Sequence, residues 1–276
     1  MKEIEIRTEQ LFLHYIIDLF NKRIRVLHMN GSVDSAIEVL EKAVKKDNIE
    51  KLIIYAKREF FTNWLSKGFQ LEAMIDRYFS GTDAYIFTKY YTSERRTSTF
   101  WMEEETILHS LVAKFDHSSL PQNYSLRLAT VDDADQLAEL YKTVFAIYPT
   151  PMDDPYYIQN VMLQNTLFAC ITEEGKIVSA ASAEIDRKNG NAEITDCATY
   201  AIHRKKGLMK VLITFLEKQL MKEQIFCTYS IARALSFGMN NAFYQLGYQY
   251  RGRLTNNCYI FDKLEDMNMW VKNLAN

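Results

Sequence analysis

The stretch from Thr166 to Tyr200 constrains the fold more than any other part of the sequence. It consists of three apolar segments separated by the short turn sequences EEGK (173–176) and RKNGN (187–191). Glycine in a short polar loop between two apolar runs is typical of a β-hairpin. Two such loops in succession predict a three-stranded antiparallel meander, whose strands follow one another directly in the chain.

Helices and further strands are expected on both sides of this meander. Apolar residues recur at helical spacing from Leu208 to Leu220, which predicts one buried face of a helix. The other expected elements are a strand (124–130), a helix (132 or 133 to about 146), a helix with Pro155 near its first turn, a strand (226–232), a helix ending at Gly247-Tyr248 and a strand (256–263). This order predicts a mixed α/β domain.

The N-terminal part of the chain alternates between strands and helices as well. The expected elements are a strand (23–29), a helix (32–48) capped by Ser32 or Asp34, a strand (51–56), a helix (58–68) and a strand pair (69–79 and 83–91). The sequence HSSLPQN (117–123) suggests a boundary between a domain of residues 1–117 and a domain of residues 118–276. In both parts a helix ends at Gly plus an aromatic residue and strands follow, so the first domain is expected to be a degenerate half-copy of the second.

Charge and cysteine content exclude several classes of protein. The net charge of −2 argues against a nucleic-acid partner, because such proteins usually carry a basic excess. The four cysteines lie far apart with no histidine at ligand spacing, so we expect neither a disulfide framework nor a metal site. The N-terminus is polar and no apolar run approaches the roughly 20 residues that span a bilayer. We therefore expect a cytoplasmic protein with no membrane partner.

Three cations stand directly before the helix that starts near Leu208. Arg204, Lys205 and Lys206 occupy the end where the helix dipole is positive, at a cost of roughly 0.3–1 kcal/mol each. A helix N-terminus binds phosphate, and Gly207 would let the backbone approach the anion closely. The segment therefore predicts a phosphate site, although it is also compatible with a solvated turn before a helix that only packs.

The order of elements and this basic turn resemble the GNAT acyltransferase superfamily over residues 124–263. Its pattern R/Q-x-x-G-x-G/A reads Arg204-Lys205-Lys206-Gly207-Leu208-Met209 here, and only Met209 departs from it. The resemblance implies a mixed, mostly antiparallel central sheet with flanking helices, and acetyl-CoA as co-substrate without a metal. The cofactor-binding residues that it implies are Thr199, Ala201, Arg204, Lys205, Lys206, Gly207, Leu208, Met209, Ser236 and Phe243.

Acetyl transfer to an amine requires removal of a proton near neutral pH, because an alkylammonium has a pKa near ~10.4. Glu193 stands eleven residues before Arg204, where a branch of the family resembling histone acetyltransferases has its general base. Asp196 is the alternative base, and strand alternation places it on the opposite face from Glu193. Both carboxylates are also compatible with a purely structural role.

The position expected for a general acid departs from the family pattern. Where the family commonly has tyrosine, four residues before the glycine that ends the following helix, this chain has Phe243. Two alternatives follow. Either the neighbouring Tyr244 protonates the departing thiolate after a local shift, or the thiolate leaves without a tyrosine.

Several stretches are similar to a narrower family, the bacterial and archaeal β-lysine N-acetyltransferases. They include AIYPTPMDDPYYI (146–158), NAEITDCAT (191–199), YRGRLTNNCYIF (250–261) and, in the first domain, GFQLEAMIDRYFSGTDAY (68–85). The resemblance implies transfer of acetyl to N6 of β-lysine, which gives the compatible solute Nε-acetyl-β-lysine. A diamino acid needs carboxylates for its ammonium and a cation for its carboxylate; the substrate-binding candidates are Asp153, Asp154, Glu184, Asp196, Arg233 and Arg251, although Asp153-Asp154-Pro155 also reads as a plain helix cap.

Three other functions stay open at the level of sequence. The acceptor amine could be lysine, a polyamine or a peptide; the chain could be a non-catalytic acyl-CoA sensor; or the first domain could carry an interaction function. Asp34 lies where the first domain would bind a pyrophosphate, and its charge would repel one, so we expect no cofactor there. We expect this domain either to wall the acceptor pocket or to form a homodimer contact.

Overall fold

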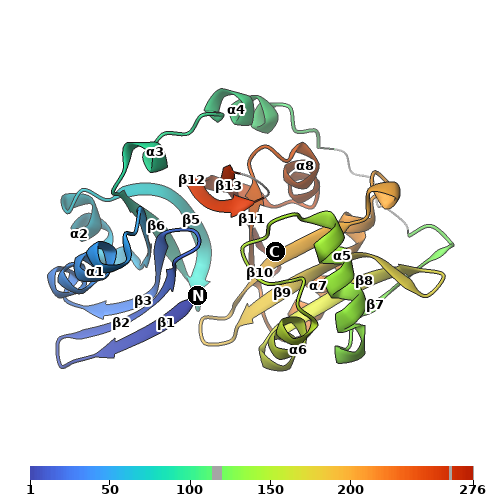
Figure 1. Cartoon of the computed structure of the whole chain (residues 1–276), viewed down its shortest axis with the longest axis horizontal. Coiled ribbons are helices and arrows are strands. Elements are labelled where there is room, and N and C mark those ends of the chain that lie inside the picture. The colour runs from blue at the N-terminus through green and yellow to red at the C-terminus, as the bar shows by residue number, and fades with distance from the viewer. Residues whose placement is uncertain (114–119, 261–262, 276) are drawn as a thin grey trace.

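The computed structural model describes residues 1–113, 120–260 and 263–275. Its strands form one continuous 13-stranded sheet in the order β1-β2-β3-β4-β6-β5-β12-β13-β11-β10-β9-β8-β7 (Figure 1). Helices flank this sheet, so the predicted mixed α/β class with a mostly antiparallel sheet is confirmed.

The N-terminal half comprises six strands and two helices. In chain order they are β1 (Lys2–Arg7), β2 (Leu11–Asp18), β3 (Arg23–Gly31), α1 (Val33–Asp47), β4 (Lys51–Ala56), α2 (Phe61–Ser66), β5 (Gln70–Phe79) and β6 (Thr82–Tyr90). Two short helices, α3 (Ser93–Arg96) and α4 (Trp101–His109), lie in the connection to the second half. The domain boundary proposed at 117/118 falls outside the described residues.

The C-terminal half contains the predicted meander and its flanking helices. In chain order it has β7 (Tyr124–Leu128), α5 (Ala134–Val144), α6 (Pro155–Gln164), β8 (Thr166–Glu173), β9 (Lys176–Asp186), β10 (Asn191–Thr199), α7 (Leu208–Lys222), β11 (Cys227–Arg233), α8 (Phe237–Gln245), β12 (Gln249–Ile260) and β13 (Lys263–Asn273). Strands β1, β2 and β13 were not among the elements expected from the sequence.

The two halves share one plan. Each contains a three-stranded antiparallel meander, β1–β3 in the first half and β8–β10 in the second. In each, the third strand of the meander pairs in parallel with the next strand across a helix: β3 with β4 after α1, and β10 with β11 after α7. The strand order β1-β2-β3-β4-β6-β5 is therefore repeated as β8-β9-β10-β11-β13-β12. Apart from β7, the two halves accordingly share one strand topology, and the proposed origin of the N-terminal half as a degenerate copy stays a prediction.

The halves join through their equivalent strands β5 and β12, which pair antiparallel at Gly252 and Ala73. Antiparallel pairing of equivalent strands relates the two halves by an approximate two-fold axis. Gly252 has φ +128°, and a Cβ there would lie 2.2 Å from the Glu72 carbonyl oxygen. Only glycine allows the two backbones to approach this closely.

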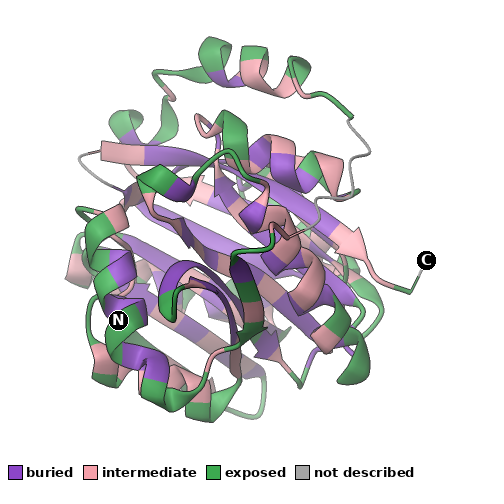
Figure 2. Ribbon diagram, turned by 90° about the vertical axis from the view of Figure 1, so that its right-hand side faces the viewer, coloured by how far each residue is buried: buried purple, intermediate pink, exposed green. Residues whose placement is uncertain are grey.

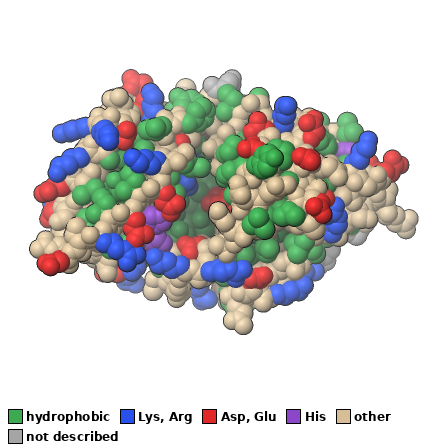
Figure 3. All heavy atoms as spheres, turned by 60° about the horizontal axis from the view of Figure 1, so that its bottom comes forward, with side chains coloured by type: hydrophobic (Ala, Val, Ile, Leu, Met, Phe, Trp, Pro, Cys, Tyr) green, Lys and Arg blue, Asp and Glu red, His purple; other side chains and the backbone are tan. Residues whose placement is uncertain are grey.

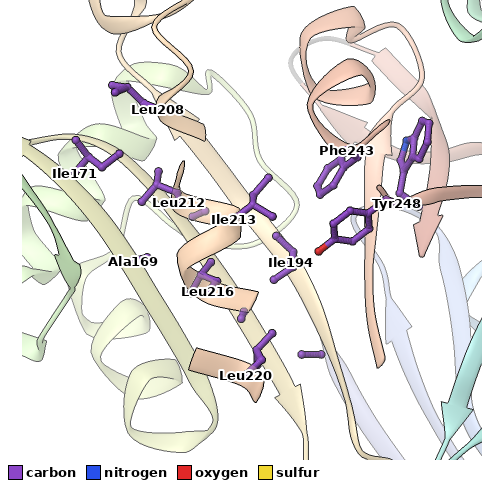
Figure 4. Close-up of a cluster of buried hydrophobic side chains, with 14 of the residues drawn as sticks. Ala169, Ile171, Ile194, Leu208, Leu212, Ile213, Leu216, Leu220, Phe243 and Tyr248 are labelled. Atoms are coloured by element: carbon purple, nitrogen blue, oxygen red, sulfur yellow. The ribbon is translucent and has the colours of Figure 1, made fainter. Parts of the chain in front are cut away.

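Helix α7 packs on one face of the C-terminal sheet through the predicted apolar stripe (Figure 4). Leu208, Leu212, Leu216 and Leu220 are buried against β8–β10, and Ile194 faces them from β10. Helices α5 and α6 pack on the opposite face of the same strands. Figure 2 shows that strand residues are mostly buried, whereas the outer faces of the helices are exposed. Strands β8–β10 are therefore covered by α7 on one face and by α5 and α6 on the other.

A third apolar cluster joins the halves at their centre. It brings Ile53, Tyr55 and Tyr78 of the N-terminal half against Cys227 and Tyr229 of the C-terminal half. These side chains lie on the sheet face opposite α1 and α7, because the alternate residues of β4 and β11, such as Ile54 and Ala232, belong to the clusters under those helices. This face is consequently shared by both halves.

Candidate active site

Strand β10 departs from its neighbours in the middle of the sheet. It pairs with β11 only over Asn191–Glu193, and its register with β9 skips Asp196 and Cys197. Asp196 has φ +49°, the left-handed conformation that accompanies a β-bulge. The two parallel strands therefore separate beyond Glu193, and the backbone of the bulge lies outside both ladders.

The basic turn follows the end of β10. Gly207 is the residue before the first turn of α7 and has φ +76°, while Lys205 has φ +63°. The cations thus precede the helix rather than belong to it, and the side chain of Arg204 folds back to donate from Nε to the Thr199 carbonyl at 3.1 Å. The unpaired N–H groups of the first helical turn open towards this loop.

A cavity of about 600 Å³ connects the basic turn with the bulge. It runs between the separated strands and reaches the N-terminal part of α8. From the expected cofactor-binding set it is lined by Thr199, Arg204, Lys205, Gly207, Leu208, Met209, Ser236 and Phe243, and from the bulge by Thr195, Asp196 and Cys197. An elongated ligand with an anionic group at the helix N-terminus and a reactive group at the bulge fits this shape.

Asp196 is buried and held by three neighbouring groups. Its carboxylate accepts hydrogen bonds from Tyr148 Oη (3.0 Å) and Ser182 Oγ (2.6 Å), and its carbonyl accepts one from Tyr141 Oη (2.9 Å). Burial raises the pKa of Asp196, and the two hydroxyl donors to the carboxylate oppose that rise. These bonds fix the bulge and occupy the carboxylate.

The bulge also changes which way Asp196 points. Strand alternation predicted it on the face opposite Glu193, but this prediction is wrong. Its carboxylate contacts Ser182, which lies two residues from Glu184 on β9, and Glu184 pairs directly with Glu193. The left-handed residue interrupts the alternation, so all three carboxylates lie on the face turned away from α7.

Glu193 is partly buried and is the last residue of β10 that pairs with β11 before the strands separate; the cavity begins two residues further on, at Thr195, and Glu193 does not line it. Loss of hydration is the main cause that raises the pKa of Glu193 to about 7. The positive charge of Arg25 in β3 opposes this rise, as does the hydrogen bond from the Tyr229 hydroxyl, whereas the negative charge of Asp196 contributes to it. Glu184 remains in contact with solvent. Partial desolvation, followed by the repulsion of Asp196 and Glu193, raises the pKa of Glu184 to about 8. A carboxyl group with a pKa near 7 suits proton transfer at neutral pH.

Comparison with known proteins agrees with this geometry. Residues 134–248 match the model of the "Acetyltransferase (GNAT) family". The chain is 40% identical over 260 residues to the N-acetyltransferase YodP of Bacillus subtilis, covering 93% of this chain and 94% of that protein. The chain belongs to the GNAT acetyltransferase family.

Two archaeal members of this family are similar along nearly their whole length. The chain is 36% identical to the β-lysine N(6)-acetyltransferase of Methanosarcina mazei, covering 88% of this chain and 98% of that protein. It is 34% identical to the protein of the same name from Methanococcus maripaludis, covering 91% and 93%. As a GNAT enzyme, the chain transfers acetyl from acetyl-CoA to an amine, and the resemblance to this family seen in the sequence is confirmed.

Some expected cofactor and catalytic residues do not reach the cavity. Lys206 donates from Nζ to Tyr124 Oη at 2.7 Å, on the other side of the turn, and Ala201 lies exposed in the short helical turn before Arg204. Tyr244 is 41% exposed and is not among the residues that line the cavity, whereas Phe243 beside it lines the cavity and is buried. Helix α8 therefore presents the phenyl ring of Phe243 to the cavity, at the position where a tyrosine would donate a proton.

The residues expected to bind the acceptor also separate into two groups. Asp154 caps α6 by accepting from Tyr156 N at 2.9 Å, and Asp153 is exposed beside it. Arg251 pairs with Asp76 of β5 at 2.8 Å, and Arg233, which lines the cavity, pairs with Glu265 at 2.8 Å. Of the expected set only Glu184 and Asp196 lie beside Glu193.

The structure adds residues to the site that the sequence did not single out. They are Arg25 in β3, Tyr148 after α5, Ser182 in β9 and Tyr229 in β11. Arg25 could have been singled out from the sequence, because it is a charged residue inside the otherwise apolar strand RIRVLHM. Among the described residues no cluster of metal-ligating side chains occurs, and no helix there is long and apolar enough to cross a membrane.

Proposed function

We propose that this chain acetylates the N6 amine of β-lysine, with Glu193 as the general base. The observation that carries the proposal is the pair of directly opposed carboxylates Glu184 and Glu193 on the face where β10 and β11 separate. Two acidic groups about 5 Å apart at their Cβ atoms match an acceptor that carries two ammonium groups. The names of two archaeal relatives support β-lysine as that acceptor.

The chain's residues suit direct transfer. Gly207 and the first turn of α7 would hold the pyrophosphate of acetyl-CoA, while the cavity leads its thioester to the bulge. Glu193 takes one proton from the acceptor ammonium, and the neutral amine attacks the thioester carbonyl. Collapse of the tetrahedral intermediate breaks the C–S bond, and the second nitrogen proton passes to solvent as the amide forms. Backbone N–H groups at the Asp196-Cys197 bulge, which lie outside both ladders, would stabilise the oxyanion.

We further propose that the thiolate leaves without a tyrosine acid. Phe243 lines the cavity and has no proton to donate, and Tyr244 does not line it. A thiol has a pKa of roughly 8.5, so its thiolate is a tolerable leaving group near neutral pH. In this mechanism Tyr244 does not protonate the departing thiolate.

The product explains why such an enzyme would be useful. Acetylation removes one of two ammonium charges from β-lysine, and the remaining ammonium and carboxylate leave no net charge. A small zwitterion of this kind suits a compatible solute, and the supply of acetyl-CoA suits a cytoplasmic reaction. Lysine and polyamines are the competing acceptors within the same chemistry.

The test follows CoA thiol release with β-lysine, L-lysine and spermidine. We expect the highest kcat/KM with β-lysine, and a fall of about 10²–10⁴-fold in Glu193→Gln, the range for loss of a general base. Glu174→Gln changes an exposed carboxylate in the β8–β9 turn and is the matched control. A higher kcat/KM for spermidine would overturn the acceptor assignment, and full activity of Glu193→Gln would overturn the base.

A further inference from the structure

An amino-acid acceptor carries a carboxylate as well as ammonium groups, and its binding site needs a cation on the face that holds Glu193. This step rests on the proposed function. The two arginines suggested by the sequence are paired with carboxylates of the protein, Arg233 with Glu265 and Arg251 with Asp76. Neither arrangement offers the acceptor an anion site beside Glu193.

Arg25 of β3 lies on the required face. Its neighbours Ile24 and Val26 are buried under α1, whereas Leu27, two residues on, packs against the central cluster between the halves. Arg25 thus points away from α1 and towards the side of the sheet shared with the C-terminal half. Its positive charge lowers the pKa of both Glu193 and Glu184, which places it near both carboxylates.

The hydrogen-bonding capacity of Arg25 is largely unused. A guanidinium has five N–H donors. Its Nε is buried with no hydrogen-bond partner among the described residues, and Nη2 makes only a long contact of 3.9 Å with Met1 Sδ. A buried donor without a partner costs free energy, and a carboxylate accepting from Nε and Nη2 together would satisfy it in the bidentate geometry typical of arginine.

Arg25 lies on the sheet face shared by the two halves, and its residue is only partly buried. Figure 3 shows a hollow between the two halves, with acidic side chains at its rim. The cation reaches this face from the N-terminal half, and Glu193 and Glu184 reach it from the C-terminal half. An extended diamino acid places its carboxylate at one end and its distal amine at the other, which matches this separation of charge.

We propose that Arg25 binds the carboxylate of the acceptor amino acid. The N-terminal half then selects amino acids over plain polyamines, while the C-terminal half supplies acetyl-CoA and the base. Arg25 acts in binding and orientation, and the proton transfer stays with Glu193.

The experiment compares β-lysine with its carboxamide, which keeps both amines and lacks the carboxylate. We expect wild type to prefer β-lysine by at least tenfold in kcat/KM. In Arg25→Gln, kcat/KM for β-lysine should fall about 30-fold, mainly through KM, and for the carboxamide less than threefold. Arg25→Lys should restore part of the preference, and Arg58→Gln, an exposed arginine of the same half, should retain it.

The ratio of kcat/KM for β-lysine to kcat/KM for its carboxamide distinguishes carboxylate binding from other effects of the substitution. If Arg25 acted only by tuning Glu193 or by supporting the fold, both acceptors would lose activity by the same factor, and the proposal would be overturned. Titration calorimetry with acetyl-CoA checks that Arg25→Gln still folds and binds its co-substrate. An unchanged preference in a folded Arg25→Gln would overturn the proposal as well.

Failure of the proposed function gives a different result. If wild type acetylates L-lysine but not β-lysine, the acceptor assignment fails, and L-lysine with lysinamide provides the same acid-to-amide comparison. If wild type acetylates amines with no preference for a carboxylate, the role of Arg25 is overturned while acetyl transfer stands.

Discussion

Arg25 and Glu193 occupy the same position in the two halves of the molecule. Arg25 is the third residue of β3 and pairs with Ile53 in the parallel strand β4; Glu193 is the third residue of β10 and pairs with Tyr229 in the parallel strand β11. Both point away from the helix that follows their strand. One fold position therefore carries a cation in one half and a carboxylate in the other.

The two halves also differ at the start of the helix that follows this strand. In the C-terminal half, Gly207 opens the turn before α7 and the bulge leads to the cavity. In the N-terminal half, Ser32 caps α1 by accepting from Ser35 N at 3.2 Å, and Asp34 pairs with Lys67 at 2.5 Å. The equivalent helix terminus thus carries a side-chain cap and an acidic residue where α7 has a glycine turn, and in our proposal the first half contributes Arg25 to the acceptor site instead.

The pH dependence of the reaction should report Glu193. Its pKa is raised to about 7, chiefly by desolvation, and only the ionised form can accept the proton. The kcat/KM for the acceptor should therefore fall about tenfold per pH unit below pH 7 and level off above it. In Arg25→Gln the loss of a nearby positive charge should move this limb to higher pH. A limb that stays in place in Glu193→Gln would assign it to another group.

Gly207→Ala should weaken acetyl-CoA binding. At φ +76° a Cβ costs roughly 1–2 kcal/mol, and it also restricts the approach of an anion to the backbone. We expect the KM for acetyl-CoA to rise about tenfold with little change in kcat. Gly190→Ala, at φ +68° in the open β9–β10 turn, carries the same strain and is the control. Equal KM increases in both variants would show that strain alone explains the effect.

Much of the C-terminal half was predictable because its signals are local. The meander follows from alternating apolar runs and glycine turns, and α7 follows from helical spacing, both within short windows of sequence. Strand β13 was missed because its sequence reads as polar. Glu265, Asp266 and Asn268 are nevertheless buried, and their environment includes partners from distant parts of the chain, such as Arg233.

The site was predictable only where it depends on the turn. Gly207 and Arg204 could be placed from the pattern around them, but Asp196 was assigned to the wrong face because a bulge reverses the alternation that the prediction assumed. Arg25 lies 168 residues from Glu193 in the chain, and only the joining of β5 with β12 brings the two halves together. Contacts of this kind depend on tertiary structure and leave no periodic trace.

Asn240 should be a strong determinant of stability beside the cavity. Its buried amide links the end of β11, the start of α8 and β13, and loss of several buried hydrogen bonds in Asn240→Ala should lower the free energy of unfolding by about 3 kcal/mol. Its bonds are Nδ2 to the carbonyls of Arg233 (2.9 Å), Ala234 (3.3 Å) and Ser236 (2.8 Å), and Oδ1 from Asn268 Nδ2 and Trp270 Nε1 (both 2.9 Å).

Urea unfolding of Asn240→Ala measures this effect, with Asn160→Ala on the exposed face of α6 as control. Because Ser236 lines the cavity, the same variant should also weaken acetyl-CoA binding. A change below 1 kcal/mol would mean that water replaces the amide without loss.

Glu184→Gln should stabilise the fold, and more so at alkaline pH. The pKa of Glu184 is raised from 4.5 to about 8 in the folded protein, so the folded state holds a proton that the unfolded state has lost between those values. Stability therefore falls as the pH rises through this window, chiefly because the ionised Glu184 is partly desolvated and also because Asp196 and Glu193 repel it. Glutamine removes that charge. We expect the Tm difference between variant and wild type to be larger at pH 8.5 than at pH 5. The control Glu174→Gln should show no such dependence of its Tm difference on pH. A Tm difference for Glu184→Gln that does not depend on pH would mean that the effect comes from packing rather than from the charge.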